Sequence, residues 1–236
     1  MTRYGTLYGV GVGPGDPDLL TLKAVKTLAA VDVVFAAAST KNEASLALSI
    51  AAPHLRPGVE TLRLDFPMTR DRAVLDAAWR ANADAVAARL EGGRSAAFLT
   101  LGDPLTYSTF GYLLRTLNGL LAEITVKVVP GVTSYQAAAA RTGRVLAESG
   151  ESLAVISGVA SEDELVRTLA AADSAVIMKA YKNMPAIRRA LERLGLTRSA
   201  VFVTRLGLPD EAVIANLDAA PDKPSYFSLI LVRREG

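Results

Sequence analysis

Hydrophobic positions along the chain follow two different spacings. Short, almost continuous apolar runs bounded by polar residues or glycine are typical of buried parallel strands. Longer segments place apolar residues three and four positions apart, which is the spacing of an amphipathic helix. The apolar runs predict strands at residues 7–12, 31–37, 59–64, 96–101, 124–129, 153–156, 175–178, 200–204 and 226–232. The helical spacing predicts helices after Thr21 and at residues 43–52, 71–90, 109–121, 135–141, 162–171 and 185–194.

Strands and helices alternate in this pattern, which predicts an α/β fold with helices covering a mainly parallel sheet. Residues 1–121 are expected to form an N-terminal α/β domain with a parallel sheet. The later strands are spaced less regularly, so residues 122–236 are expected to form a C-terminal α/β domain with a mixed sheet. The boundary near Ala122 is placed to give halves of similar size, since no linker composition marks it.

The stretch 95–112 joins a predicted strand to a polar loop and then to a helix. Gly102, Asp103 and Pro104 end the apolar run, because glycine permits close backbone approach and proline offers no donor. Ser108 is a suitable N-cap for the helix that follows. Open α/β sheets bind ligands at the carboxyl ends of their strands, so this loop is a candidate site. The alternative is an ordinary turn between a strand and a helix.

Composition and charge restrict the classes of function. The chain has 236 residues, 50% of them hydrophobic, and a formal net charge of +2. No basic tail accompanies this balance, so nucleic-acid binding is not indicated, whereas a small anionic substrate is compatible with it. No apolar segment approaches the roughly 20 residues that cross a bilayer, so no membrane association is expected. A cytoplasmic location is therefore the expectation.

Cysteine and histidine chemistry is almost absent from the sequence. There is no cysteine, which excludes disulfides, thiol catalysis and cysteine-bound metals. His54 is the single histidine and follows Pro53 in a segment that ends a helix, so it is expected at the surface or at a helix end. Nothing nearby supports a catalytic triad or a histidine-bound metal, and no metal is expected.

The glycines near the N-terminus do not form a dinucleotide fingerprint. Counting G-x-G-x-x-G from Gly9 places Pro14 at the third glycine, and counting from Gly11 places Asp16 there. No G-K-[ST] follows, so a P-loop is excluded. The segments GPGDPDLLT, LGDPLTYS and PGVTSYQAA instead form three similar loops, each after a predicted strand. Their backbone amides and carbonyls can hold a zwitterionic, adenosine-bearing ligand without a phosphate cradle.

At these residues the chain resembles the tetrapyrrole methylase family, the S-adenosylmethionine enzymes of corrin and siroheme synthesis. GVGVGPGDPDLLTLKA is similar to the family's N-terminal signature, LGDP to its central motif and PGVTS to its third motif. The resemblance covers essentially the full length. GDPLTYSTFGYL, PGVTSYQAAAA, KAYKN and YFSLILV most resemble the branch that methylates precorrin-2 at C-20 to give precorrin-3A.

The resemblance implies two α/β/α domains with an inter-domain cleft, a homodimer, and S-adenosyl-L-methionine as the cofactor, with S-adenosyl-L-homocysteine as its product. It also implies no metal requirement of the protein. The residues that it assigns to the cofactor are Pro14, Leu101, Gly102, Asp103, Thr106, Thr133, Ser134, Met178 and Ser228.

A tetrapyrrole carries several carboxylates, which require cationic and polar partners. The candidates for these contacts are Tyr107, Lys179, Tyr181, Lys182 and Arg205. The alternative for Lys179 and Lys182 is a solvated loop, and for Arg205 it is a solvated surface position.

The expected reaction transfers a methyl group from the sulfonium to a ring carbon, and water, Asp103 or Tyr107 accepts the proton that leaves. Three alternatives remain: methylation at another tetrapyrrole position, methylation of cobalt-precorrin-2, and a non-catalytic tetrapyrrole carrier.

Overall fold

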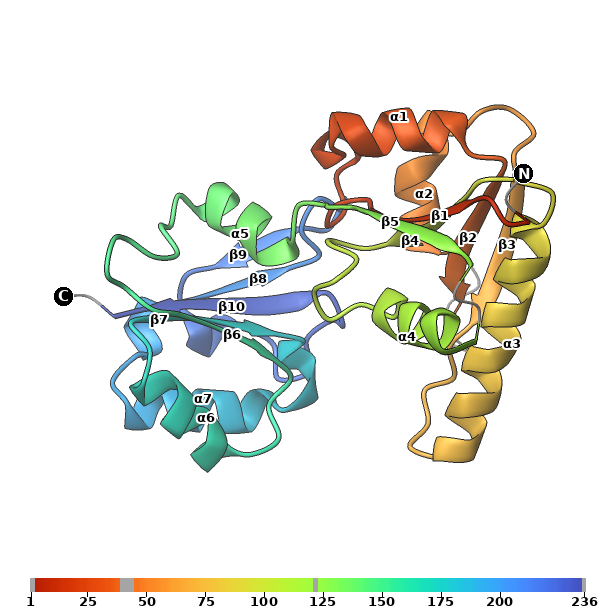
Figure 1. The fold of residues 1–236 in the computed structure, drawn as a ribbon. Coiled ribbons are helices and arrows are strands. Elements are labelled where there is room, and N and C mark those ends of the chain that lie inside the picture. Colours follow the sequence, from red (N-terminus) through yellow and green to blue (C-terminus); the bar gives the residue numbers. More distant parts are fainter. Residues whose placement is uncertain (1–2, 39–44, 121–122, 235–236) are drawn as a thin grey trace. The chain divides into compact units, whose positions relative to one another are not determined.

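The protein folds into two compact α/β units, Met1–Thr133 and Ser134–Gly236. The structure is a computed structural model, and it describes residues 3–38, 45–120 and 123–234. Each unit contains one five-stranded sheet with helices packed against it (Figure 1). The α/β fold class with two domains is therefore confirmed, and each unit has a core of its own.

The first unit is built on a sheet in which every pair of neighbouring strands is parallel. The strand order is β3-β2-β4-β1-β5. The parallel sheet predicted for the N-terminal half is confirmed. The strands are β1 Thr6–Gly11, β2 Val33–Ala38, β3 Glu60–Asp65, β4 Ala96–Thr100 and β5 Thr125–Val129.

The position of β5 corrects the predicted domain boundary. The sequence pattern assigned this strand to the C-terminal domain, which was expected to begin near Ala122. The strand pairs with β1 along its whole length, from Thr6 opposite Thr125 to Val10 opposite Val129. The division therefore falls between Thr133 and Ser134. An apolar run shows that a strand forms, but its sheet partner depends on contacts distant in sequence.

Helices cover both faces of the first sheet because strand side chains alternate between the faces. In β4, Ala97 and Leu99 pack in a cluster with α1 and α2, whereas Ala96 and Phe98 pack in a cluster with α3 and α4. All five residues of β4 are buried, as its continuous apolar run predicts. The helices are α1 Leu22–Ala30, α2 Leu46–Ala51, α3 Arg72–Leu90 and α4 Phe110–Leu120, with 3-10 turns η1 Pro17–Leu19 and η2 Ala52–His54.

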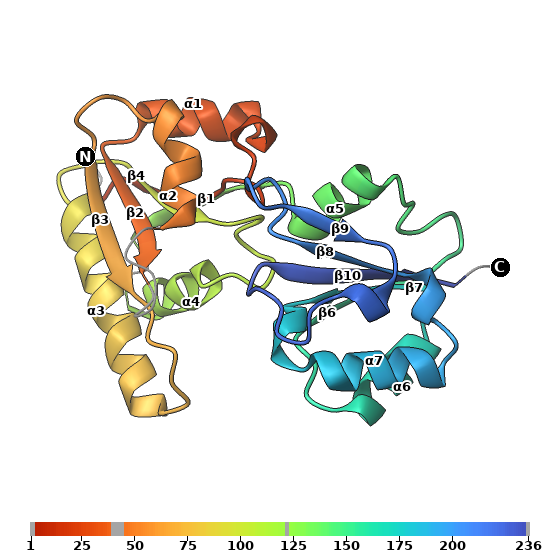
Figure 2. The same cartoon turned by 180° about the vertical axis from the view of Figure 1, so that it is seen from behind.

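The second unit has the mixed sheet that the sequence predicts. Its order is β6-β7-β10-β8-β9, with β6 parallel to β7 and the other pairs antiparallel. Helices α6 and α7 cover one face, and α5 lies on the other (Figures 1 and 2). The elements are α5 Ser134–Thr142, β6 Leu153–Ser157, α6 Glu162–Ala170, β7 Ser174–Met178, η3 Ala180–Lys182, α7 Met184–Arg193, η4 Thr197–Ser199, β8 Ala200–Thr204, β9 Ala212–Ile214, η5 Leu217–Ala219 and β10 Ser228–Arg233.

Local signals in the sequence locate most helix starts. Thr21 caps α1 by accepting a hydrogen bond from the Ala24 amide at 3.1 Å. Ser108 accepts one at 3.1 Å from the amide of Phe110, the first residue of α4, and so lies one residue before the cap position that was predicted for it. Ser134 was expected to precede its helix but is instead the first helical residue. His54 ends η2, as predicted. Strand β9 was not predicted, because this edge strand of three residues is too short to show a period.

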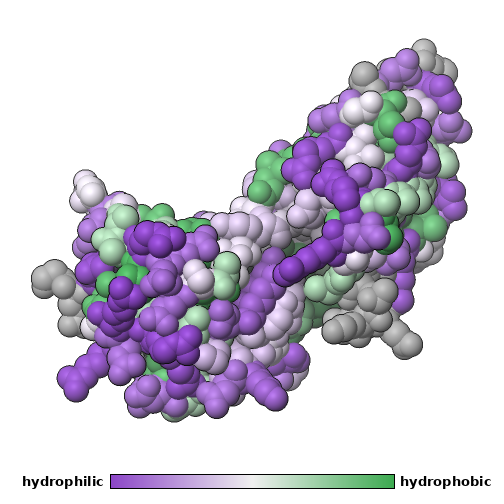
Figure 3. Space-filling model, turned by 90° about the horizontal axis from the view of Figure 1, so that it is seen from below, coloured by the Kyte–Doolittle hydropathy of each residue, from purple (hydrophilic) through white to green (hydrophobic). Residues whose placement is uncertain are grey.

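Hydrophilic residues predominate on the face of the molecule shown in Figure 3, and apolar residues are scattered among them. Within the described ranges, no helix combines the length and apolar character that a membrane span requires.

Candidate functional site

Three neighbouring strands of the first sheet bring the three predicted loops together. Strands β4, β1 and β5 are adjacent and parallel, so their carboxyl ends meet at one edge. The first two loops remain paired beyond the strands: the Val12 amide donates to the Thr100 carbonyl at 2.9 Å, and the Gly102 amide donates to the Gly13 carbonyl at 2.8 Å. The topology thus gathers the segments that the sequence analysis singled out.

Glycines allow these loops to pack backbone against backbone. A Cβ atom on Gly11 would lie 2.7 Å from the backbone of Gly131, and one on Gly131 would lie 2.8 Å from the backbone of Gly11. The Gly102 carbonyl approaches both positions even more closely. Side chains cannot be accommodated at such distances, so these glycines are required by the packing of the loops themselves.

Asp103 connects the second loop to the third. One carboxylate oxygen accepts from the Leu105 amide at 2.9 Å and from the Thr106 hydroxyl at 3.4 Å, and the other accepts from the Gly131 amide at 3.2 Å. These bonds shape the Asp103 turn and hold the β5 loop against it. The predicted residues Asp103 and Thr106 are therefore brought together, with Asp103 in a positioning role.

Four other predicted cofactor residues follow the same strands, the last of them at the start of the second unit. Pro14 is half-buried in the loop after β1, and Leu101 is half-buried directly after β4. Thr133 is buried after β5, and Ser134 begins α5. The first loop is shaped separately by Asp16, which accepts a hydrogen bond from the Asp18 amide at 2.9 Å and caps η1.

Three predicted substrate residues have a strained backbone. Among the residues that the structure describes, the non-glycine positions with positive φ are Tyr107 at 52°, Lys179 at 54° and Arg205 at 52°. Each lies in a loop that follows a strand, and Lys179 and Arg205 are the first residues after β7 and β8. This conformation costs on the order of 1–3 kcal/mol for a residue with a side chain and is concentrated at functional sites. The backbone therefore supports all three as functional candidates.

The second sheet also collects predicted residues at one edge. Met178 ends β7 opposite Leu229, and Ser228 begins β10 opposite Thr204, the last residue of β8. The hydroxyls of Ser228 and Thr204 are buried and have no hydrogen-bond partner among the described residues. Directly opposed residues of an antiparallel pair share a face, so both hydroxyls lie on the same side of the sheet. A buried polar group without a partner requires an explanation, and a ligand is one.

Thr204 was not among the predicted site residues, although it directly precedes the predicted residue Arg205. Its pairing with Ser228 depends on the strand register, which no local pattern reveals.

Cationic and aromatic side chains follow β7. Burial, and secondarily the charge of Lys182, lower the pKa of Lys179, which favours the neutral amine more than in an exposed lysine. The Tyr181 ring lies 5.3 Å from the Tyr226 ring, and burial, followed by Tyr181, raises the pKa of Tyr226. The structure thus brings Lys179, Tyr181 and Lys182 together through η3 and adds Tyr226, which the sequence analysis did not select.

Arg205 already has a carboxylate partner within its own loop. Its guanidinium forms an ion pair with Asp210, and this hydrogen bond lowers the pKa of Asp210. The Arg205 amide donates to the Phe227 carbonyl at 2.8 Å, which ties the loop to the segment before β10. A substrate carboxylate would have to compete with Asp210 for this guanidinium.

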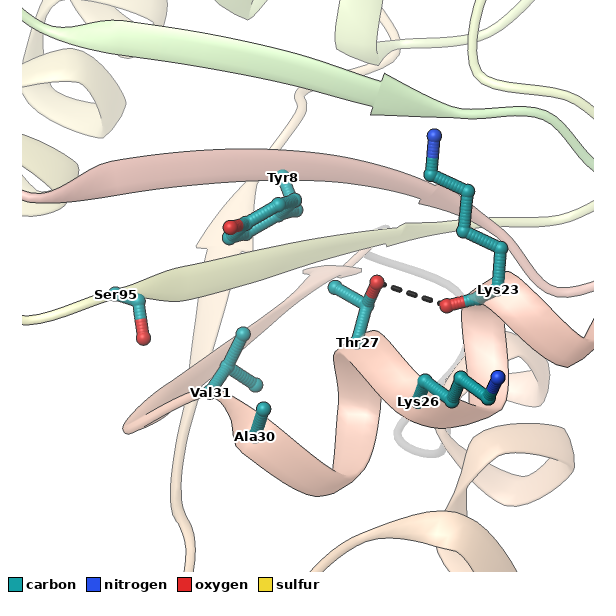
Figure 4. A pocket seen from close by; sticks show the side chains of 7 residues that line it. All are labelled: Tyr8, Lys23, Lys26, Thr27, Ala30, Val31 and Ser95. Atoms are coloured by element: carbon teal, nitrogen blue, oxygen red, sulfur yellow. Dashed lines mark hydrogen bonds between the residues drawn. The ribbon is translucent and has the colours of Figure 1, made fainter.

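Two hollows are lined by described residues of the first unit. One, of about 240 Å³, lies between α1 and the sheet and is lined by Lys23, Lys26 and Thr27 of the helix and by Tyr8 of β1 (Figure 4). Val31 and Ser95, which also line it, precede β2 and β4, so it reaches toward the amino ends of these strands. The other hollow, of about 250 Å³, lies beside the Asp103 turn and is lined by Pro104, Leu105, Tyr107, Ser108, Gly111, Tyr112 and Arg115.

Metal-binding side chains are not clustered in the described ranges: no group of three or more His, Cys, Asp or Glu residues there could hold a metal ion.

A sequence profile of the tetrapyrrole (corrin/porphyrin) methylases matches residues 6–221. The chain belongs to this family. Its strand-end loops, which carry no phosphate-binding motif, are compatible with this membership.

Two curated relatives are similar over nearly the whole chain. The cobalt-precorrin-2 C(20)-methyltransferase of Salmonella typhimurium is 39% identical, with 98% of this chain and 97% of the relative covered. The precorrin-2 C(20)-methyltransferase of Sinorhizobium sp is also 39% identical, with 97% and 95% covered. Among solved structures, uroporphyrin-III C-methyl transferase from Thermus thermophilus complexed with S-adenyl homocysteine is 26% identical, with a TM-score of 0.66 and 97% of each chain covered.

Proposed function

We propose that this protein is an S-adenosylmethionine-dependent C-methyltransferase of cobalamin biosynthesis that methylates precorrin-2 at C-20 to give precorrin-3A. The observation that carries the proposal is the 39% identity, over almost the entire chain, to two relatives named for this reaction. The strand-end loops support it, because their packing gathers three loops at the carboxyl ends of adjacent parallel strands, where open α/β sheets bind ligands.

For the cofactor, the proposed contacts of the first unit are backbone groups of the three loops. Because Asp103 is engaged by Gly131, Leu105 and Thr106, its contribution is to hold the loops in the binding geometry. In the second unit, the unpartnered hydroxyl of Ser228 supports a ligand contact, and Thr204 joins it. The proposed cofactor residues are Pro14, Leu101, Gly102, Asp103, Thr106, Thr133, Ser134, Met178 and Ser228, and the inter-domain cleft stays a prediction.

For the substrate, Tyr107, Lys179, Tyr181, Lys182 and Arg205 are the proposed contacts. In the reaction, the bond between the donor sulfur and the methyl carbon breaks as a new carbon–carbon bond forms. The donor is already activated as a sulfonium, so the protein's tasks are alignment and exclusion of water. The three donors on Asp103 favour water or Tyr107 over Asp103 as the acceptor of the released proton.

The form of the substrate is tested directly, because the two equally similar relatives differ in whether their names include cobalt. Purified protein is incubated with S-adenosylmethionine and with precorrin-2 or its cobalt complex, and the product is analysed by mass spectrometry and NMR. A methyl group at C-20 supports the proposal and identifies the preferred form. A methyl group at another carbon overturns the proposed position.

Calorimetry with S-adenosylhomocysteine distinguishes an enzyme from a carrier. Tetrapyrrole binding without any binding of this product would identify a carrier. A ligand that binds the native state also raises the melting temperature, which gives a second measurement. We further propose a cytoplasmic homodimer that requires no metal. Size-exclusion chromatography with light scattering tests the dimer, and turnover after chelation tests the metal.

A further inference from the structure

The hollow beside the Asp103 turn is lined by a cation, Arg115, that forms no ion pair among the described residues. Its guanidinium carbon lies 5.0 Å from the centre of the Tyr112 ring. Tyr112 in turn stacks on Trp79 of α3, with ring centroids 4.8 Å apart and planes 6° apart. Two packed aromatic rings therefore support the guanidinium at the wall of the hollow.

The rim of this hollow is unusually apolar for a surface loop. Leu105 is 61% exposed and Tyr107 is 52% exposed, and both follow the Asp103 turn directly. Tyr107 has the strained backbone described above, at φ 52°. An exposed leucine and an exposed tyrosine beside a cation are suited to a ligand with an apolar body and an anionic group.

Gly111 is the second independent observation. It is the second residue of α4 and lines the hollow, and its φ is not positive, so the helix does not require glycine there. A Cβ atom at this position would meet no other atom within 4 Å, so packing within the chain does not require glycine either. Glycine is a poor helix former. The missing side chain leaves room in the hollow, and a ligand would use that room.

We propose that this hollow binds one carboxylate-bearing arm of the tetrapyrrole substrate, with Arg115 as its cationic partner and Gly111 providing the space. The proposal rests on the proposed function, which supplies the tetrapyrrole. At about 250 Å³ the hollow falls below the usual size of a site for a whole drug-sized ligand, so it admits an arm rather than the macrocycle. Leu105 and Tyr107 then contact the apolar edge from which the arm extends.

The charge is tested with Arg115→Gln, with Arg115→Lys as the conservative variant and Arg72→Gln as the control. Arg72 is matched because its guanidinium carbon lies 5.1 Å from the Trp79 ring centre, at the same pair of stacked rings, but it pairs with Asp76 and does not line the hollow. We expect Arg115→Gln to raise the KM for precorrin-2 about tenfold, with kcat and S-adenosylhomocysteine affinity nearly unchanged. Arg115→Lys keeps the positive charge, so its KM should rise less than that of Arg115→Gln.

The space is tested with Gly111→Leu, with Gly119→Leu as the control. Gly119 lies in the same helix and also has no atom within 4 Å of a Cβ position, but it does not line the hollow. Both substitutions improve helix propensity, so neither should lower the melting temperature. Gly111→Leu should raise KM about tenfold or more, whereas Gly119→Leu should leave it unchanged.

The outcomes separate this proposal from the proposed function. If the wild-type protein methylates neither form of precorrin-2, the proposed function is overturned. The hollow is then tested by binding alone: the dissociation constants of the same variants are measured for uroporphyrin, a stable porphyrin with many carboxylates. The proposal is overturned if the KM or dissociation constant for the tetrapyrrole is the same in Arg115→Gln as in Arg72→Gln, or the same in Gly111→Leu as in Gly119→Leu. Selective weakening in both pairs, with unchanged S-adenosylhomocysteine affinity, establishes it.

Discussion

The strand-end loops of the two units are built in different ways. In the first unit, Gly11, Gly102 and Gly131 pack backbone against backbone, and Asp103 ties the loops together. In the second unit, side chains dominate: strained Lys179 and Arg205 follow two strands, and buried hydroxyls of Thr204 and Ser228 lack partners among the described residues. We infer that the strand-end loops of the first unit are rigid before a ligand binds. Those of the second unit depend on the ligand to supply hydrogen-bond partners for their polar groups.

The largest expected effect comes from breaking the packed backbone of the first unit. In Gly131→Ala, the new methyl group would overlap the backbone of Gly11 and Gly102, so the loops must separate. We expect the free energy of unfolding to fall by about 2–3 kcal/mol, as for overpacked positions, and S-adenosylhomocysteine binding to be lost. Urea denaturation and calorimetry measure the two effects. Normal stability and binding in this variant would show that the loops adapt readily and are not rigid.

The Asp103 link should have the next largest effect. Asp103→Ala removes the acceptor of the Gly131 amide and of two groups in its own turn. We expect a loss of about 1–2 kcal/mol in stability and a roughly tenfold loss in S-adenosylhomocysteine affinity. Asp16→Ala is the control, because Asp16 caps η1 without joining two loops. If both variants bind equally well, Asp103 only shapes its own turn.

In the second unit, substitutions of the two ion-pair partners Arg205 and Asp210 are expected to change KM in opposite directions. Arg205→Ala should raise the KM for the tetrapyrrole about five- to tenfold, as for the loss of a partly exposed charged hydrogen bond. Asp210→Asn should lower KM, because it removes the carboxylate that competes for the guanidinium. Steady-state kinetics on both variants test this. A KM that rises in both cases would mean that Asp210 holds Arg205 in its binding position.

The smallest effect concerns backbone strain at Lys179. Glycine adopts the left-handed conformation without cost, so Lys179→Gly should raise the free energy of unfolding by about 1 kcal/mol. Lys179→Ala loses the same amino group but keeps the strain, and should give no such gain. Both variants should raise KM to a similar extent. A Lys179→Gly protein that is no more stable than Lys179→Ala would show that the backbone is not strained there.

This contrast also explains what the sequence could predict. The α/β class, the parallel and mixed sheets and the loops after β1, β4 and β5 follow from apolar runs and glycine-rich turns, which are local signals. The assignment of β5 to the first sheet, the pairing of Thr204 with Ser228 and the ion pair between Arg205 and Asp210 depend on register and on folded loops. Sequence motifs therefore predicted the loops at the edge of the first sheet, whereas the residues at the edge of the second sheet were only partly predicted.

The point at which the chain passes from one unit to the other has a consequence for modular exchange. The division between Thr133 and Ser134 falls inside the PGVTS segment, without a separate linker. A recombination that exchanges the second unit between relatives must therefore cut through this segment or carry it whole. Chimeras joined after Ser134 keep PGVTS from one parent, and we expect them to tolerate exchange better than those joined within the motif.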